Sequence, residues 1–355
     1  MRFIGNKENL VEKIYQVMQE KGISGSSFFD VFSGTTSVAQ FFKKLEYKTI
    51  TSDLLYFSYV LQQAYIVNSI EPKFEKLFKK LNFQGGNLFA SPLSIVVEYL
   101  NQIQPIEGFI YKNYTPQGTA HLEQCRTYFS NENGKIIDAI RQKIEEWKNE
   151  KLITQNEYYI LIACLIETVP FYANITGIYA AFQKNWDPRA VKKIELREIK
   201  LLSNNKLNEA YNEDSVTLAS NINADIFYLD PPYNQRQYAP NYHLLETIAK
   251  YDNPKIKGVT GLRDYSNQKS AFCNPKTGIV ELEKIVKNAH CKFLIMSYNS
   301  EGIMPQNKIL EILGKYGKVE LIEFQYLRFK SNNNGVSKYK KHIKEQLYIL
   351  NKFKN

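Results

Sequence analysis

Residues 225–233 read Asp-Ile-Phe-Tyr-Leu-Asp-Pro-Pro-Tyr, an apolar run that ends in an acidic residue, two prolines and an aromatic ring. The run from Ile226 to Leu229 predicts a buried strand, because the prolines that follow cannot continue its hydrogen-bond ladder. A residue before proline favours extended geometry, so we expect Asp230 to project from the carboxyl end of that strand. Open α/β sheets bind their ligands at this edge, and the sequence therefore predicts an α/β fold with a polar site there.

The turn after this strand offers hydrogen-bond acceptors suited to a planar amino group. Asp230 supplies a carboxylate, Pro231 a carbonyl oxygen, and Tyr233 an aromatic face. Accepting from both N–H groups of a nucleobase amine favours its nucleophilic, pyramidal form, and stacking on Tyr233 would hold a base that has left its helix. The residues leave one alternative open, a purely structural Pro-Pro turn with a surface tyrosine.

The tetrad resembles the Asp-Pro-Pro-Tyr signature of amino-group DNA methyltransferases, which transfer a methyl group from S-adenosylmethionine. The resemblance implies that Asp230, Pro231, Pro232 and Tyr233 are the catalytic residues. It also implies a Rossmann-like methyltransferase fold, with a seven-stranded, mostly parallel sheet whose last hairpin is antiparallel. The order of the motifs is similar to that of the alpha-class adenine methyltransferases of restriction-modification systems, in which a mainly helical target-recognition region is inserted.

Composition favours a polyanionic partner. The 355 residues include 46 Lys+Arg against 36 Asp+Glu, a formal net charge of +10. The four cysteines and four histidines are scattered, so we expect thiols in a reducing compartment and no metal site. We find neither a charged-then-apolar leader nor a long apolar run, and therefore expect a cytoplasmic protein that makes no membrane contact.

Residues 27–38 read as a strand, a glycine turn and a helix, an arrangement that lets a ligand approach the backbone closely. They resemble the methyltransferase loop Phe-x-Gly-x-Gly, with Thr36 where the second glycine usually stands. The resemblance implies that S-adenosylmethionine contacts this loop at Phe32, Ser33, Gly34 and Thr35. An ordinary strand-turn-helix explains the pattern as well.

Three further residues are expected to contact the donor. Lys7 lies in a Gly-Asn-Lys segment before a helix, which resembles the segment beside the donor's carboxylate. Asp53 ends a short strand at 48–52 and could accept from ribose hydroxyls, although it could equally cap the next helix. The resemblance implies an acidic contact to the donor's adenine at Asp214, with Glu213 as the rival, and a place for Asp230 beside the donor as well.

The order of strands and loops breaks off in the middle of the chain. We expect a first catalytic segment at 1–70, an inserted helical target-recognition region at 71–203, and a second catalytic segment at 204–355. Amphipathic helices are predicted at 135–150 and 156–169. Polar loops around them present Arg126, Lys184 and Arg189, side chains of the kind that contact bases and phosphates, although solvated loops on a helical cap explain them too.

Two later segments are also candidates for DNA contact. Residues 255–276 form a long polar stretch with Arg263 and Lys269, which we expect to fold against DNA or over the site. The last two predicted strands enclose a basic loop that includes Lys338, Lys340 and Lys341, enough positive charge to hold several phosphates. A solvated loop is the alternative.

We therefore expect a DNA methyltransferase that flips adenine out of duplex DNA and methylates its exocyclic amine, with a cognate restriction endonuclease acting separately. Two readings within the enzyme class stay open, namely methylation of the cytosine amine and methylation of RNA. A DNA-binding module that keeps the fold without turnover is the alternative from another class. The recognition sequence cannot be read from the chain.

Overall fold

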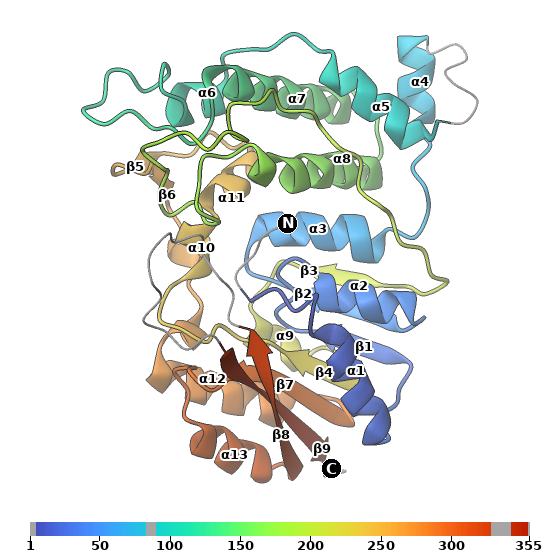
Figure 1. Ribbon diagram of the computed structural model, residues 1–355. Coiled ribbons are helices and arrows are strands. Elements are labelled where there is room, and N and C mark those ends of the chain that lie inside the picture. The colour runs from blue at the N-terminus through green and yellow to red at the C-terminus, as the bar shows by residue number, and fades with distance from the viewer. Residues whose placement is uncertain (1–4, 83–89, 328–341, 354–355) are drawn as a thin grey trace. The chain divides into compact units, whose positions relative to one another are not determined.

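The computed structural model describes residues 5–82, 90–327 and 342–353, which form two compact units (Figure 1). The sheet unit comprises Ile4–Ser69, Leu202–Tyr238 and Asn267–Asn355. The helical unit comprises Ile70–Leu201 and Ala239–Ser266. Each unit is therefore assembled from segments that are far apart in the sequence.

The sheet unit is built on a seven-stranded sheet. Its strands, in spatial order, are β3 (Glu209–Tyr211), β2 (Lys48–Ser52), β1 (Ser27–Asp30), β4 (Ile226–Leu229), β7 (Phe293–Asn299), β9 (His342–Lys352) and β8 (Gly317–Leu327). The pairs from β3 to β7 are parallel, and β9 runs antiparallel to both of its neighbours. This confirms the predicted α/β fold with a mostly parallel sheet and an antiparallel last hairpin.

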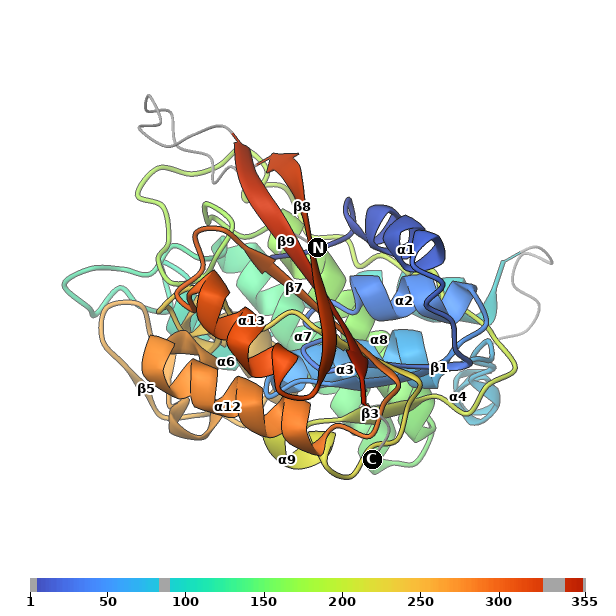
Figure 2. The same cartoon turned by 90° about the horizontal axis from the view of Figure 1, so that it is seen from below.

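Side chains alternate between two apolar layers along the central strands, as the two-residue period of a strand requires. On β4, Ile226 and Tyr228 face one layer, whereas Phe227 and Leu229 face the other. Helices α1 (Val11–Glu20) and α2 (Ser37–Lys44) cover the first layer, and α9 (Ser215–Ala219), α12 (Pro275–Asn288) and α13 (Gln306–Gly314) cover the second. Figure 2 shows the two groups of helices on opposite faces of the sheet. Because both faces are covered, the central strands read as continuous apolar runs.

After β2 the chain continues as α3 (Tyr56–Gln62) and a π-helical turn, Gln63–Val67. Lys43 of α2 fastens the end of this turn. It is fully buried, and its ammonium group donates to three main-chain carbonyls, those of Tyr65, Ile66 and Asn68. A buried lysine is thus used to satisfy carbonyls that a helix end leaves without partners.

The helical unit contains α4 (Glu75–Leu81), α5 (Pro92–Asn101), α6 (Phe109–Tyr114), α7 (Asn131–Asn149), α8 (Gln155–Thr168), α10 (Tyr238–Asn241) and α11 (His243–Lys250). Helices α7 and α8 confirm the helices predicted at 135–150 and 156–169, although α7 begins at Asn131, four residues earlier than predicted. Thr154 begins α8 with a capping box, in which its side chain accepts from the Glu157 N–H and the Glu157 carboxylate accepts from the Thr154 N–H. A two-stranded hairpin, β5 (Ile256–Lys257) and β6 (Leu262–Arg263), completes the unit.

The observed division of the chain differs from the expected one in one respect. The inserted unit occupies Ile70–Leu201, close to the expected 71–203, but Ala239–Ser266 joins it from the expected second catalytic segment. The polar stretch at 255–276 is correspondingly split. Its first part forms the hairpin of the helical unit, and its second part forms two 3-10 turns, Ser266–Gln268 and Ala271–Cys273, and the start of α12.

None of the helices in the described ranges is long and apolar enough to cross a lipid bilayer. Among the same residues, no group of three or more His, Cys, Asp or Glu side chains is arranged to hold a metal ion.

Candidate active site

The Asp-Pro-Pro-Tyr tetrad lies at the carboxyl edge of the sheet, directly after β4. Leu229 pairs with Met296 in the parallel ladder of β4 and β7, so Asp230 leaves the sheet beside the position of Ser297. Pro231 is buried, whereas Pro232 and Tyr233 are half-buried. The Tyr233 carbonyl accepts from the Ile303 N–H, which fastens the end of the turn.

The N-terminal segment packs against this turn. Gly5 has a φ of +79°, and a Cβ on it would come within 3.5 Å of the Tyr233 ring and of the Tyr238 hydroxyl. The next turn brings Lys7, a residue only 7% exposed, to the tetrad, where its Nζ lies 3.4 Å from Asp230 Oδ1. The structure therefore unites two predicted site residues, Lys7 and Asp230, that are more than 200 positions apart in the sequence.

Lys7 has a second and closer carboxylate partner. Its Nζ donates to Glu345 Oε1 at 2.6 Å, and the same oxygen accepts from the Ser297 hydroxyl at 2.7 Å. Glu345 lies near the start of β9 and is 2% exposed. Two carboxylates thus share one ammonium group in a buried setting.

Burial and charge together set the ionisation of this cluster. Burial raises the pKa of the Asp230 carboxyl to about 7, the Glu345 charge adds to the rise, and Lys7 opposes it. For Lys7, burial acts against the charge, but the carboxylates of Asp230 and Glu345 outweigh it and raise the pKa of the ammonium group above its ordinary value. Burial likewise raises the pKa of Tyr233. Lys7 therefore carries its charge throughout the neutral range, while Asp230 titrates within it.

The glycine loop after β1 is held against the neighbouring strand. The Ser33 N–H donates to the Ser52 carbonyl at 3.0 Å, and the Gly34 N–H donates to Asp53 Oδ2 at 3.0 Å. Gly34 has a φ of +48° and Thr36 a φ of +66°. The φ of Thr36 lies in the left-handed region that favours glycine, so the backbone of Thr36 is strained. The same φ explains why a glycine would be expected at this point of the loop.

The aromatic and hydroxyl residues of the loop have contacts of their own. The Phe32 ring meets Phe272 edge-on, with 5.1 Å between the ring centroids. Thr35 is 8% exposed, and its hydroxyl lies 3.0 Å from that of Ser37. Neither contact tests the expected role of these residues in donor binding, which stays a prediction.

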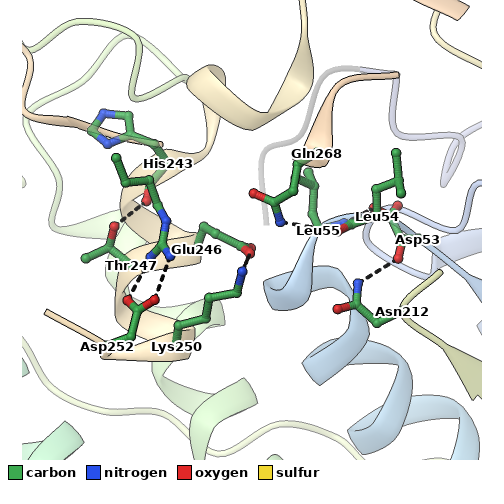
Figure 3. Close-up of polar contacts among 11 residues, drawn as sticks. Asp53, Leu54, Leu55, Asn212, His243, Glu246, Thr247, Lys250, Asp252 and Gln268 are labelled. Atoms are coloured by element: carbon green, nitrogen blue, oxygen red, sulfur yellow. Dashed lines mark hydrogen bonds and ion pairs between the residues drawn. The ribbon is translucent and has the colours of Figure 1, made fainter. Parts of the chain in front are cut away.

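Asp53 engages both of its carboxylate oxygens. One accepts from Gly34, as above, and the other accepts from the Leu55 N–H at 2.8 Å, ahead of α3. Figure 3 shows Asn212 donating to the Asp53 carbonyl and Gln268 donating to the Leu54 carbonyl. Asp53 therefore links the glycine loop to the start of the next helix, and its contact with a ribose stays a prediction.

Asp214 is exposed and caps α9, where its carboxylate accepts from the N–H groups of Val216 and Thr217 at 3.0 and 3.3 Å. Its rival Glu213 is exposed too. The structure therefore shows that Asp214 caps α9. Its contact with the donor's adenine stays a prediction.

Two acidic residues of the site were missed by the sequence analysis. Asp30, the last residue of β1, is 2% exposed, and within the described ranges its Oδ1 has no hydrogen-bond partner. Burial, with the nearby charges of Asp230 and Asp53, raises the pKa of the Asp30 carboxyl well above its ordinary value. Its place at a strand end before a glycine turn was a usable signal. For Glu345, an acidic residue in a Lys-rich stretch, no local signal existed.

The residues expected to bind DNA fall into three groups. Arg126 and Arg263 are each 7% exposed, and both are engaged inside the helical unit. The Arg126 guanidinium donates to the carbonyls of Asn113, Gly258 and Val259, and that of Arg263 pairs with Asp252 at 2.8 Å. These contacts give both arginines a structural role.

The remaining candidates are exposed or undescribed. Lys184 and Lys269 are exposed, and Arg189 is exposed and pairs with Asp187. Lys338, Lys340 and Lys341 lie outside the described residues. Contact of any of these side chains with DNA stays a prediction.

Comparison with known proteins identifies the family. Residues 3–312 match the family described as D12 class N6 adenine-specific DNA methyltransferase. The chain is 39% identical to the modification methylase StsI of Streptococcus sanguinis, over 99% of this chain and 52% of that protein. It is 39% identical to the type II methyltransferase M.FokI of Planomicrobium okeanokoites, over 100% of this chain and 54% of that protein. The chain thus spans about half the length of these two relatives.

A third relative is matched along its whole length. The type II methyltransferase M.NlaIII of Neisseria lactamica is 36% identical, over 99% of both chains. Since the family match covers most of the residues and this relative is aligned from end to end, the chain belongs to the D12 class of N6 adenine-specific DNA methyltransferases.

Proposed function

We propose that this protein is a site-specific DNA methyltransferase that transfers a methyl group from S-adenosylmethionine to the exocyclic amine of adenine in duplex DNA. The observation that carries the proposal is the placement of Asp230. Its carboxylate stands on a rigid Pro-Pro turn at the sheet edge, with Lys7 at 3.4 Å and the glycine loop on the neighbouring strand β1. A nucleobase amine needs such a fixed acceptor.

The residues at this edge fit the proposed donor. S-adenosylmethionine carries a sulfonium, an ammonium group and ribose hydroxyls, and the strand ends of β1, β2 and β4 present Asp30, Asp53 and Asp230. The Oδ1 of buried Asp30 has no hydrogen-bond partner in the part of the chain that the structure describes, and a cationic ligand would satisfy it. When bound there, the donor would supply an electrophilic methyl group.

The chain's own groups would then prepare the amine. The Asp230 carboxylate and the Pro231 carbonyl accept from its two N–H groups, which directs the nitrogen lone pair at the methyl carbon. As the N–C bond forms and the S–C bond breaks, positive charge develops on nitrogen, where these acceptors stabilise it. One proton must leave the amine afterwards, and Asp230, whose pKa is about 7, is suited to receive it. Tyr233 would stack on the flipped base.

The decisive experiment incubates the protein with isotopically labelled S-adenosylmethionine and unmethylated DNA, and then identifies the labelled nucleoside. Label on the adenine amine is expected. Label on cytosine would keep the acceptors but change the base, whereas label in RNA alone, or none, would overturn the proposal in favour of an RNA enzyme or of a non-catalytic DNA-binding module.

A variant tests the assigned role of Asp230. Asp230→Ala should lower turnover by about three orders of magnitude or more, because both acceptance and proton removal are lost, while DNA affinity stays within about twofold. Glu311→Ala is the matched control, since Glu311 is exposed on α13 and its carboxylate pairs with Lys308 at 2.8 Å. Turnover by Asp230→Ala comparable with that of this control would refute the role.

We also propose that the enzyme acts in the cytoplasm as the modification component of a restriction-modification system, with a restriction endonuclease acting separately. The support is the names of the relatives, which are modification methylases or type II methyltransferases. The test has two steps. The methylated sequence is mapped first, and modified DNA is then treated with endonucleases that cut at that sequence. Protection from cutting is expected, and unimpeded cutting would refute the proposed role in restriction-modification.

A further inference from the structure

Glu345 is the best-buried acidic group near the tetrad that the proposed mechanism does not use. Three adjacent strands bring the cluster together: Asp230 directly follows β4, β7 carries Ser297, and β9 carries Glu345. In the antiparallel ladder Glu345 pairs with Asn299, two residues beyond Ser297, so Ser297 and Glu345 share one face of the sheet. Their hydrogen bond of 2.7 Å follows from that register.

The two contacts of Lys7 are unequal. The Nζ to Glu345 Oε1 distance of 2.6 Å is that of a strong, charge-assisted hydrogen bond. The Nζ to Asp230 Oδ1 distance of 3.4 Å is an ion pair but too long for a strong hydrogen bond. Lys7 is therefore held by Glu345 and only faces Asp230.

We propose that Glu345 is a positioning residue, which anchors Lys7 so that the lysine neutralises Asp230 without occupying its acceptor oxygen. The inference rests on the proposed function, because it assumes that Asp230 must accept from a substrate amine. Without the anchor, Lys7 would close to about 2.8 Å from Asp230, the usual distance of such a pair, and would compete with the amine. Ser297 holds the Glu345 carboxylate in place.

The proposal predicts that substitutions at Glu345 and Lys7 shift the pKa of Asp230 in opposite directions. Removing the Glu345 charge eliminates a repulsion and should make Asp230 more acidic, whereas removing the Lys7 charge should make it less acidic. The other ionisable groups whose charges couple to Asp230 are Asp30 on β1, Tyr228 on β4 and Tyr233 in the tetrad. Because burial raises the pKa of both tyrosines, they stay neutral near pH 7, and an Asp30→Asn variant separates any contribution of that carboxyl.

The test is the pH dependence of kcat/KM for the wild-type protein, Glu345→Gln and Lys7→Gln. The wild-type profile should fall on its acid side with a midpoint near the Asp230 pKa of about 7. In Glu345→Gln the midpoint should move about one pH unit to lower pH, with kcat reduced about tenfold or more because Lys7 competes for Asp230. In Lys7→Gln it should move to higher pH. Glu320→Gln is the matched control, since Lys21 and Glu320 lie 2.6 Å apart on the exposed surface, and it should change neither value.

A purely structural role for Glu345 would lower the folded fraction and leave the midpoint where it was, and that result would overturn the proposal. If Glu345→Gln fails to fold, Ser297→Ala replaces it, because that change removes only the hydroxyl that holds Glu345. Its kcat should fall about threefold to tenfold, corresponding to one lost hydrogen bond, and its midpoint should move in the same direction. An unchanged kcat and midpoint in Ser297→Ala would then overturn the proposal.

A titration without turnover separates this inference from the proposed function. The Asp230 carboxyl can be followed by carbon NMR in protein labelled at aspartate and assigned with Asp230→Asn. Its midpoint should fall in Glu345→Gln and rise in Lys7→Gln even if no nucleic acid is methylated. If the titration midpoint of Asp230 is the same in wild type and in both variants, the proposal that Glu345 positions Lys7 is overturned, whatever the substrate is.

Discussion

Asp225, the first residue of the stretch that ends in the tetrad, joins the neighbouring strands β1 and β4. Its Oδ2 accepts from the N–H groups of Ser26 and Ser27 at 2.7 and 3.0 Å, and from their hydroxyls at 3.1 and 2.9 Å. The Asp225 N–H in turn donates to the Ser27 hydroxyl at 2.8 Å. One carboxylate oxygen therefore fastens the start of β1 to the start of β4, and both strands lead to the site.

Two substitutions at Asp225 should lower the free energy of unfolding by different amounts. Asp225→Ala removes all four hydrogen bonds that the carboxylate accepts. Hydrogen bonds to charged groups contribute about 1.5–3 kcal/mol each when buried and less when exposed. We therefore expect the free energy of unfolding to fall by about 2–4 kcal/mol in total. Asp225→Asn keeps an oxygen for the same donors but loses the charge, and should cost about 1–2 kcal/mol. Asp264→Asn is the control, because its bonds stay within one exposed turn.

The pH dependence of this effect has a definite sign. Burial acts to raise the pKa of Asp225, but the bonds from Ser26 and Ser27 outweigh it and hold the pKa below the ordinary value of 3.8. Stabilisation by the charge is therefore fully present above that value, and is lost as pH falls through the lower pKa of the folded state. The difference between wild type and Asp225→Asn should be constant from pH 8 to pH 5 and shrink only in stronger acid.

Hydrogen exchange of the β1 and β4 amides along a urea series is the suitable assay, because two compact units need not unfold in one step. A loss below about 0.5 kcal/mol in Asp225→Ala would refute the reasoning, since that is the size of an ordinary surface substitution. So would a difference between wild type and Asp225→Asn that grew in acid.

Substitutions at three further positions separate strain, capping and recognition. Thr36→Gly should leave the free energy of unfolding within about 1 kcal/mol of wild type, because relief of the left-handed backbone offsets the lost hydroxyl bonds, whereas Thr36→Val should cost about 2 kcal/mol in urea unfolding. Lys43→Met should lower the free energy of unfolding by about 3 kcal/mol or more in the same assay, since it removes the three hydrogen bonds that Lys43 donates to main-chain carbonyls. Arg126→Met should destabilise the helical unit by about 2–3 kcal/mol and leave the salt dependence of DNA binding unchanged; a slope reduced by about one would instead mark a phosphate contact.

Two strands that carry the site could be predicted from their local sequence. Ile226–Leu229 stops at Asp-Pro-Pro, and the strand predicted at 48–52 is observed as β2 with the same bounds. The edge strand β3 could not be predicted, because its three residues are all half-buried and carry no alternating pattern. The segment 239–266 belongs to the helical unit, whereas the sequence placed it in the second catalytic segment, because nothing local in it shows which unit it packs with.

Residue type indicates what a side chain can do, but it does not show which neighbours that side chain meets. Lys7 and Asp230 were both selected from motifs, and the structure brings them together. Arg126 was selected because arginines contact DNA, yet its guanidinium holds three carbonyls of its own unit. A sequence shows that a side chain can donate hydrogen bonds, but only the packing around the side chain shows which acceptors it meets. Buried structural arginines and exposed DNA-contacting arginines therefore cannot be told apart from the sequence alone.

The position of Glu345 follows from the direction of β9. Strands β1, β4 and β7 run parallel and deliver their carboxyl ends to the catalytic edge, whereas β9 is antiparallel to β7 and reaches the same edge with its first residues. Lys7 therefore meets one carboxylate after the end of β4, Asp230, and a second at the start of β9, Glu345, on the face that β9 shares with Ser297. Topology, rather than a motif, then selects the residue.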